Sequence, residues 1–201
     1  MISTVKIPKT TYPVNEFIRK RWSPRSFANK TIPQETLDQL FEAASWAPSS
    51  VNEQPWRYLF AHKGEPAFEK MVACLVPGNQ PWAKNAQVLV LTLAKTIFVY
   101  NGATLPNKYS FYDSGAANSQ LLLEAASHDI YGHLMGGFDH EKTKTTFHIP
   151  EGFEVVVFMA LGYLGSPEAL EEPFKTREIT PRSRKNITEF TFHGHLPEKM
   201  V

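Results

Sequence analysis

The chain has 201 residues, of which 42% are hydrophobic, 20% charged and 12% aromatic, enough to build one large domain with a buried core. This composition argues against intrinsic disorder, and the formal net charge of +1 argues against a general basic surface. We therefore expect neither nucleic acid nor a membrane as partner, and any anion site must be built locally.

The N-terminal stretch MISTVKIPKTTYP has no apolar core of signal-peptide length. The most apolar runs, VLVLTLA and EVVVFMALGYLG, are too short to span a bilayer as helices. Cys74 is the single cysteine, so no internal disulfide can form, which favours a reducing compartment. The expected location is the cytoplasm.

The first half of the chain is predicted to contain helices over 13–21, 33–46 and 66–75 and strands over 56–62 and 86–95. The second of these helices begins with proline, and its apolar residues recur at helical spacing: Leu37, Leu40, Phe41 and Ala44. The run over 86–95 is continuously apolar, which is typical of a strand covered on both faces.

In the second half, 111–132 is predicted as one helix that is apolar nearly all round, with Gly132 as its C-cap. Such a helix should be buried and could be shared with a partner. A short helix within 137–149, a strand over 151–165, a polar stretch over 166–186 and an edge strand over 187–196 follow. The strands do not alternate with helices in βαβ order, so the expected class is α+β.

The segment RKRWSPRSF places Arg21, Ser23 and Arg25 at alternate positions just after the first helix. In extended chain these side chains share one side, where two guanidinium forks and a hydroxyl would suit a phosphate. The alternative is a helix C-terminus whose cations complement the helix dipole. Both interpretations remain open from this segment alone.

The loop APSSVNEQPWRY offers the short polar side chains of Ser49, Ser50 and Asn52, while Pro48 and Pro55 hold the backbone extended. A planar heterocycle with amide-like edges would use such groups. A capped turn between helix and strand is the alternative, because Ser and Asn favour turns.

Two further segments carry weaker signals. In HLMGGFD, Gly136 and Gly137 would let a ligand approach the backbone, or would simply form a turn. In TPRSRKN, Arg182 and Arg184 could return to the same phosphate or could lie in solvent. The aromatic segment 98–112 has little regular pattern and either covers a ligand pocket or packs between helices.

Several motifs are absent from the sequence. It contains no GxGxxG after a strand, no Walker loop, no HExxH and no CxxC pair. His193 and His195 share a face of the last predicted strand, but a pair of histidines in a tail is typical of a surface, and we expect no metal. If the chain is an enzyme, a cofactor should carry the chemistry.

Together and in this order, RxSxR, APSSxNxQPWRY, GGFD and RSR resemble the FMN-dependent nitroreductase family over about residues 12–192. The resemblance implies an α+β fold with a central, mostly antiparallel sheet flanked by helices. It also implies an intertwined homodimer with two FMN molecules at the interface. We expect one domain over 1–201, whose segment from about 186 to 201 extends onto the partner subunit.

The resemblance also implies roles for individual residues of the FMN site. The phosphate and ribityl end would be held by Arg21, Ser23, Arg182 and Arg184, with Trp22 in the wall beside Ser23 and Arg25 near the ribityl chain or pyrimidine ring. The opposite subunit would contribute Pro48, Ser49, Ser50 and Asn52. The flavin ring would lie by Met135, Gly136 and Gly137, with the Gly136 N–H near flavin N(5), and its pyrimidine edge would meet Asn79 or Gln80.

The implied activity is reduction of nitroaromatics, quinones or similar electron-poor small molecules by NAD(P)H, in a ping-pong scheme that needs no catalytic side chain. Two alternatives remain open from the sequence. One is a specialised flavoenzyme of the same fold, such as a dehalogenase, a dehydrogenase or an enzyme that fragments flavin. The other is a flavin-binding protein without turnover.

Overall fold

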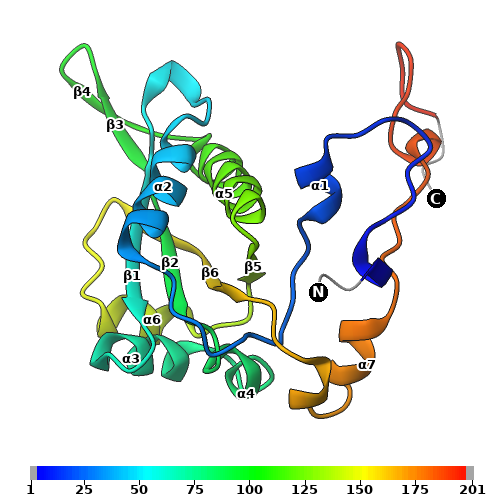
Figure 1. Ribbon diagram of the computed structural model, residues 1–201. Coiled ribbons are helices and arrows are strands. Elements are labelled where there is room, and N and C mark those ends of the chain that lie inside the picture. The colour runs from blue at the N-terminus through cyan, green and yellow to red at the C-terminus, as the bar shows by residue number, and fades with distance from the viewer. Residues whose placement is uncertain (1–3, 198–201) are drawn as a thin grey trace.

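The computed structural model describes residues 4–197 (Figure 1). Its strands are β1 Trp56–His62, β2 Val88–Lys95, β3 Ile97–Tyr100, β4 Ala103–Pro106, β5 Ile130–Met135 and β6 Phe153–Tyr163. Its α-helices are α1 Glu16–Lys20, α2 Gln34–Ser45, α3 Pro66–Cys74, α4 Gln80–Ala83, α5 Ser110–Ser127, α6 His140–Thr146 and α7 Phe174–Ile179. Short 3₁₀ helices cover Thr4–Lys6, Ser50–Asn52, Pro167–Ala169 and Ile187–Glu189.

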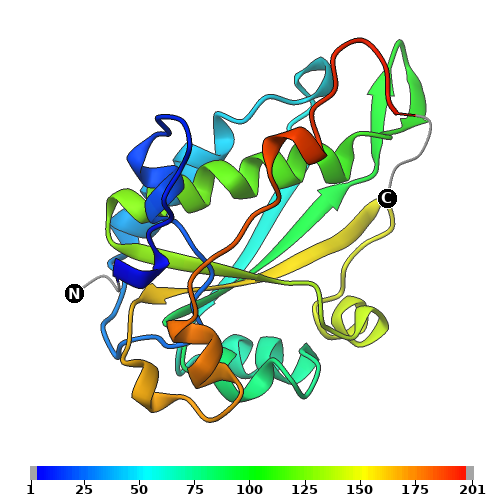
Figure 2. The same ribbon diagram turned by 90° about the vertical axis from the view of Figure 1, so that its right-hand side faces the viewer.

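Four strands form a central antiparallel sheet in the order β1-β2-β6-β5. Helices α2 and α5 pack on one face of this sheet, and α3, α4 and α6 lie toward the other (Figures 1 and 2). The α+β class and the helix-flanked antiparallel sheet predicted from the sequence are confirmed.

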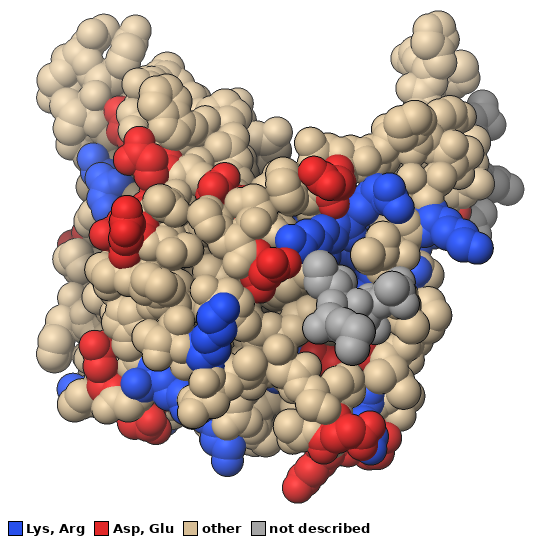
Figure 3. Space-filling view, viewed as in Figure 1, with Lys and Arg blue, Asp and Glu red and all other residues tan. Residues whose placement is uncertain are grey.

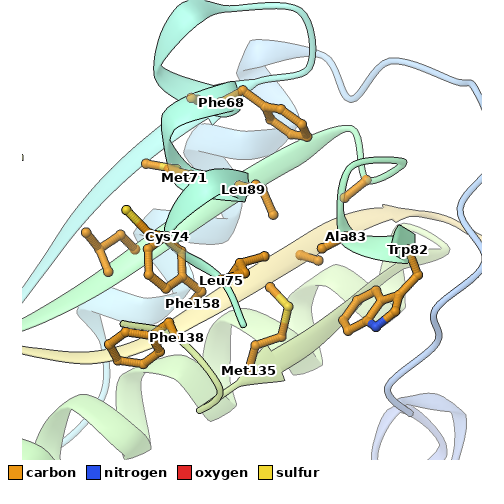
Figure 4. Packing of buried hydrophobic residues seen from close by; sticks show 14 of the residues in the cluster. Phe68, Met71, Cys74, Leu75, Trp82, Ala83, Leu89, Met135, Phe138 and Phe158 are labelled. Atoms are coloured by element: carbon orange, nitrogen blue, oxygen red, sulfur yellow. The ribbon is translucent and has the colours of Figure 1, made fainter. Parts of the chain in front are cut away.

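The central strand β2 supplies both layers of the core. Val88 and Val90 contact the layer beneath α2 and α5, whereas Leu89 and Leu91 point into the opposite layer with Phe158. Figure 4 shows Leu89 and Phe158 in that second layer. Seven of the eight residues of β2 are buried, as the continuous apolar run predicts, because alternate side chains enter two separate cores.

The predicted long helix over 111–132 is wrong at its C-terminal end. Helix α5 ends at Ser127, Asp129 adopts the left-handed conformation (φ 57°), and the chain returns as strand β5. Gly132 lies inside that strand and is not a C-cap. A Cβ there would lie 2.2 Å from Leu122, so the small residue serves the close packing of α5 on the sheet.

The second half differs from the sequence prediction in three other segments. Residues 97–106 form a separate β3–β4 hairpin, where no regular pattern was expected. The polar stretch 166–186 contains α7. The predicted strand over 187–196 is wrong, because this stretch has only a 3₁₀ turn and is exposed throughout, with no strand beside it among the described residues. Residues 198–201 of the predicted extension lie outside the described residues.

The two ends of the chain lie side by side, apart from the sheet (Figure 1). Lys6 Nζ donates to the carbonyls of Arg177 (2.7 Å) and Thr180 (2.5 Å), and the guanidinium of Arg182 donates to those of Arg19 and Arg21. Among the described residues, no helix is long and apolar enough to cross a membrane.

The segment after Arg25 joins the end of β6. Ala28 N donates to Tyr163 O (2.9 Å) and Gly165 N donates to Ser26 O (2.9 Å), so 26–28 continue the sheet for a short distance. The two backbones approach closely at Gly165, where a Cβ would lie 2.8 Å from the carbonyl carbon of Phe27.

Replacing Gly165 with alanine should lower the free energy of unfolding by about 1–3 kcal/mol, because the backbone of Phe27 cannot yield as a side chain would. Urea unfolding measures the change. Gly78→Ala is the matched control, since a Cβ at Gly78 meets no atom within 4 Å, and it should unfold like the wild type. Equal stability of the two variants would contradict the close approach.

Candidate functional site

A cationic pocket of about 210 Å³ lies where the two ends of the chain meet. Figure 3 shows Lys and Arg side chains gathered in the region of α1 and of the chain after α7. Residues 180–186 of that chain are called the late segment below. The pocket is lined by Lys6, Arg21, Trp22, Ser23, Arg25, Arg177, Arg182 and Arg184. The structure thus brings together the two arginine segments singled out in the sequence, although about 160 residues separate Arg21 from Arg182.

Like charges crowd this pocket. Burial, and then the charge of Arg184, lower the pKa of Arg21. Burial, followed by Arg21 and Arg184, lowers the pKa of Arg182. Burial also lowers the pKa of Arg25, although Glu178 opposes the shift. A bound anion would relieve the mutual repulsion of these cations.

The arginines of the pocket differ in how their donors are used. Arg182 directs both terminal nitrogens to the carbonyls of Arg19 and Arg21, so it fastens the end of α1 to the late segment. The buried Nε atoms of Arg25 and Arg182 have no hydrogen-bond partner among the described residues. Arg182 is therefore a structural clamp as well as a charge, which its sequence pattern does not reveal.

One residue absent from the sequence prediction, Glu178, holds the pocket's backbone. Glu178 is only 3% exposed, and its carboxylate accepts hydrogen bonds from the backbone N–H of Arg25 (3.0 Å) and of Ser26 (3.0 Å). Burial raises the pKa of Glu178, while these hydrogen bonds and the charge of Lys6 lower it. A single glutamate in a polar stretch gives no signal in the sequence, because its role depends on a contact across 153 residues.

Arg25 and Trp22 form aromatic contacts at the base of the pocket. The guanidinium carbon of Arg25 lies 5.6 Å from the ring centres of both Trp82 and Phe174. Trp22 is 5% exposed and meets the ring of Tyr131 edge to face, at 6.3 Å between centres. These contacts fix the walls beside Ser23, which itself stays exposed.

His133 connects the pocket to strand β5. Its Nδ1 lies 2.9 Å from the carbonyl oxygen of Pro24, so this nitrogen carries the proton and donates. Its ring packs on Trp82 with 4.6 Å between centres. Burial lowers the pKa of His133 to about 4, with the charge of Arg25 acting in the same direction.

The glycine segment follows directly on β5. Met135 is buried at the end of the strand, whereas a Cβ added to Gly136 would meet nothing within 4 Å, so open space lies on that side of the backbone. Asn79 Nδ2 donates to the Gly137 carbonyl (3.1 Å). Gln80 Nε2 instead donates to Leu75 O (2.7 Å), which ties it to the protein interior.

The loop with Pro48, Ser49, Ser50 and Asn52 does not reach the cationic pocket within one chain. It lies beyond the end of α2, away from α1 in Figure 1, and none of these four residues lines the pocket. The structure therefore brings the two arginine segments together and joins the first of them to β5 through His133 and Pro24, and it leaves this loop apart.

This loop has a strained backbone that is held from outside. Val51, Asn52 and Gln54 have positive φ values of 48°, 58° and 48°, which a β-branched residue such as Val51 rarely adopts. The carboxylate of Asp113, 3% exposed on α5, accepts from Ser50 N (3.0 Å). In the sequence, Asp113 stands out only as an acidic residue within the apolar pattern of 111–132, which does not identify its partner.

Comparison with known proteins identifies the family of the chain. The model of the nitroreductase family matches residues 18–163. A crystal structure of an oxidoreductase containing FMN is similar at a TM-score of 0.91, with 34% identity, 95% of this chain and 96% of that chain covered.

Two curated relatives agree with the family match. An uncharacterised 15.4 kDa protein of Mycolicibacterium smegmatis is 31% identical over 134 residues, covering 67% of this chain and 87% of its own length. A protein of Polynucleobacter asymbioticus with the provisional name NADH dehydrogenase/NAD(P)H nitroreductase is 28% identical over 156 residues, covering 69% of this chain and 78% of its own length. The chain has the α+β nitroreductase fold and is an enzyme that belongs to the nitroreductase family.

Proposed function

We propose that this chain binds FMN and uses NAD(P)H to reduce quinones, nitroaromatics or similar electron-poor small molecules. The observation that carries the proposal is the cationic pocket, in which Arg21, Ser23 and Arg25 meet Arg184 from the other end of the chain. The 34%-identical oxidoreductase that contains FMN supports the choice of cofactor.

The pocket fits the phosphate of FMN by its donor set. Two guanidinium Nε atoms lack partners there among the described residues. Four buried or half-buried cations also repel one another: Lys6, Arg21, Arg25 and Arg182. A phosphate dianion accepts several such donors at once and offsets their repulsion. In the proposal Arg21, Ser23 and Arg184 hold the phosphate, and Arg182 adds charge while it clamps α1.

The ring of the cofactor would lie by Met135, Gly136 and Gly137, because the backbone borders open space at Gly136. When bound, FMN supplies the hydride chemistry that no side chain of this site offers. Gly136 N–H would donate toward flavin N(5), Asn79 or Gln80 would meet the pyrimidine edge, and Arg25 would stabilise negative charge that develops near that edge.

The overall reaction balances without a catalytic acid or base from the chain. NAD(P)H supplies a hydride, which is two electrons and one proton, and solvent supplies a second proton to a quinone acceptor, giving NAD(P)⁺ and the hydroquinone. His133 would serve by position, because its Nδ1–H holds the Pro24 carbonyl beside Ser23.

We further propose a homodimer in which the loop of Pro48, Ser49, Ser50 and Asn52 completes the FMN site of the other subunit. Its separation from the cationic pocket within one chain supports this arrangement (Figure 1). Many exposed apolar side chains also favour a partner, among them Trp46, Val51, Tyr112, Ile187 and Phe190.

In the proposed dimer the 201 residues form one domain, and the segment from about 186 to 201 lies on the partner. The exposed Phe190 and Leu196, at 58% and 65%, would be covered there. The buried, unpaired Cys74 agrees with a reducing cytoplasm as the proposed location.

The absorbance spectrum of the purified protein, followed by anaerobic titration with NADH and NADPH, tests the function. Flavin bands that bleach with either nucleotide are the expected result and identify the donor. A yellow protein that does not bleach would favour flavin binding without turnover or a specialised branch. A colourless protein that takes up no added FMN would overturn the proposal.

Arg21→Ala should weaken FMN binding by about 1.5–3 kcal/mol, or roughly 10- to 100-fold in Kd, because a charge-assisted bond to phosphate is lost. Arg21→Lys keeps the charge without the planar fork, so its Kd for FMN should lie between those of the wild type and of Arg21→Ala. Fluorescence titration of the apoprotein with FMN measures each Kd.

Lys70→Ala is the matched control, since it removes one positive charge from an exposed position on α3. It should bind FMN like the wild type. If the Arg21→Ala variant bound FMN as tightly as the wild type, the segment with Arg21, Ser23 and Arg25 would not hold the phosphate.

His133 should make stability depend on pH. Its pKa in the folded chain is about 4, below the ordinary value of 6.5, so the unfolded chain takes up a proton first as the pH falls. Between pH 6.5 and pH 4 this difference should remove about 3 kcal/mol of stability, and nothing is lost from it above pH 6.5.

Urea unfolding of the wild type and of His133→Gln across this pH range measures the effect. Glutamine can still donate to Pro24 O but does not titrate, so the variant should lose less stability on acidification. The same pH slope in both proteins would contradict the assignment.

A further inference from the structure

A lysine that precedes the first α-helix, Lys6, also lines the cationic pocket. It ends the 3₁₀ turn Thr4–Lys6, which lies beside the chain after α7 (Figure 1). The match to the family model begins at residue 18, and the sequence motifs of the predicted FMN site begin at Arg21, so neither includes this lysine. The role of Lys6 therefore follows from its contacts alone.

The ammonium of Lys6 uses two of its three donors within the protein. The residue is 5% exposed, and its Nζ donates to the carbonyls of Arg177 (2.7 Å) and Thr180 (2.5 Å) at the end of α7. Nζ also lies 4.8 Å from the ring centre of Trp22, which lines the same pocket. An ammonium carries three N–H groups, so the third has no acceptor among the described residues.

The positive charge of Lys6 is not neutralised by a direct ion pair. None of the ion pairs formed by the described residues includes it. Burial lowers the pKa of Lys6, and the charge of Glu178 opposes this shift. The charges of Arg182 and Arg25 lower the pKa further. A buried cation among like charges destabilises the free protein, and a phosphate dianion in the pocket would offset that cost.

Capping of α7 explains only part of this arrangement. Cations are favourable at the C-terminus of a helix, where they complement the helix dipole. Helix α7 has only six residues, however, and a neutral amide would donate to the same carbonyls without the cost of a buried charge. The cap accounts for the two hydrogen bonds of Lys6, whereas an anion in the pocket accounts for its charge.

We propose that Lys6 binds the phosphate of FMN through its charge and makes the N-terminal segment, residues 4–10, part of the cofactor site. The inference rests on the proposed function. Lys6 then favours FMN over riboflavin, which has the same ring and ribityl chain but no phosphate. Its bond to Thr180 O connects the N-terminal segment to the late segment, so cations from both ends of the chain surround the phosphate: Lys6, Arg182 and Arg184.

Lys6→Met tests the role of the charge, because methionine is also unbranched but neutral. The Kd of the apoprotein for FMN should rise about tenfold or more, whereas the Kd for riboflavin should keep its wild-type value. Fluorescence titration with each flavin measures both constants. An equal loss of affinity for FMN and for riboflavin would mean that Lys6 only holds the fold of the pocket, and would overturn the inference.

Lys9→Met is the matched control. It makes the same chemical change in the same segment, at an exposed residue that does not line the pocket. Its affinities for FMN and for riboflavin should equal those of the wild type. If Lys9→Met lost as much affinity for FMN as Lys6→Met, the total charge of the segment would be responsible, and the assignment of Lys6 would be wrong.

Lys6→Gln separates the charge from the cap of α7. The glutamine amide keeps a donor for the carbonyls of Arg177 and Thr180 but carries no charge, so this variant retains a cap that Lys6→Met loses. Its Kd for FMN should still rise about tenfold, with no change for riboflavin. Wild-type affinity for FMN in Lys6→Gln would show that the charge is not used and would overturn the inference.

Inorganic phosphate gives a readout that needs no flavin. Added phosphate should raise the midpoint of thermal unfolding of the wild type and of Lys9→Met, and should raise it less in Lys6→Met. An equal rise in all three proteins would overturn the inference. A protein that takes up no FMN would overturn the proposed function, and the phosphate series would still test Lys6. Weaker FMN binding by Arg21→Ala but not by Lys6→Met would instead support the proposed function and contradict the role of Lys6.

Discussion

The carboxylate of Glu178 is the contact on which the cationic pocket depends. It is buried near Lys6 and Arg25, and it anchors the backbone of residues 25 and 26 rather than neutralising a guanidinium fork directly. Arg182 uses its terminal nitrogens on the carbonyls of Arg19 and Arg21, whereas Nε of Arg25 has no partner among the described residues. One negative charge inside the cluster makes it possible to hold so many positive ones in place.

The sequence was sufficient for the elements whose pattern is local. Helix α2 and strand β2 were predicted nearly to the residue, because Leu37 and Leu40 mark one helix face and β2 is apolar on both sides. The turn at Asp129 was missed, since the apolar pattern of α5 runs on into β5 without a glycine or proline between them. The stretch over 187–196 alternates like a strand, but no free sheet edge adjoins it among the described residues.

For the site, the sequence could identify residue types but not their distances. The prediction that Arg21 and Arg182 share one pocket came from the resemblance to a family, and the structure confirms their proximity. Glu178 and Asp113 could not be found this way. Each accepts a hydrogen bond from the backbone of a segment far away in the sequence, and such contacts leave no spacing to recognise.

The left-handed backbone of Val51 affects both the stability of the fold and the order of the loop, in opposite directions. A β-branched residue in this conformation costs stability, on the order of 1–3 kcal/mol, that a glycine would not. Glycine at this position would remove the strain, but it would also give the loop more backbone conformations. The loop would then be less ordered in the absence of ligand. The residue at position 51 therefore sets a balance between the stability of the fold and the order of this loop.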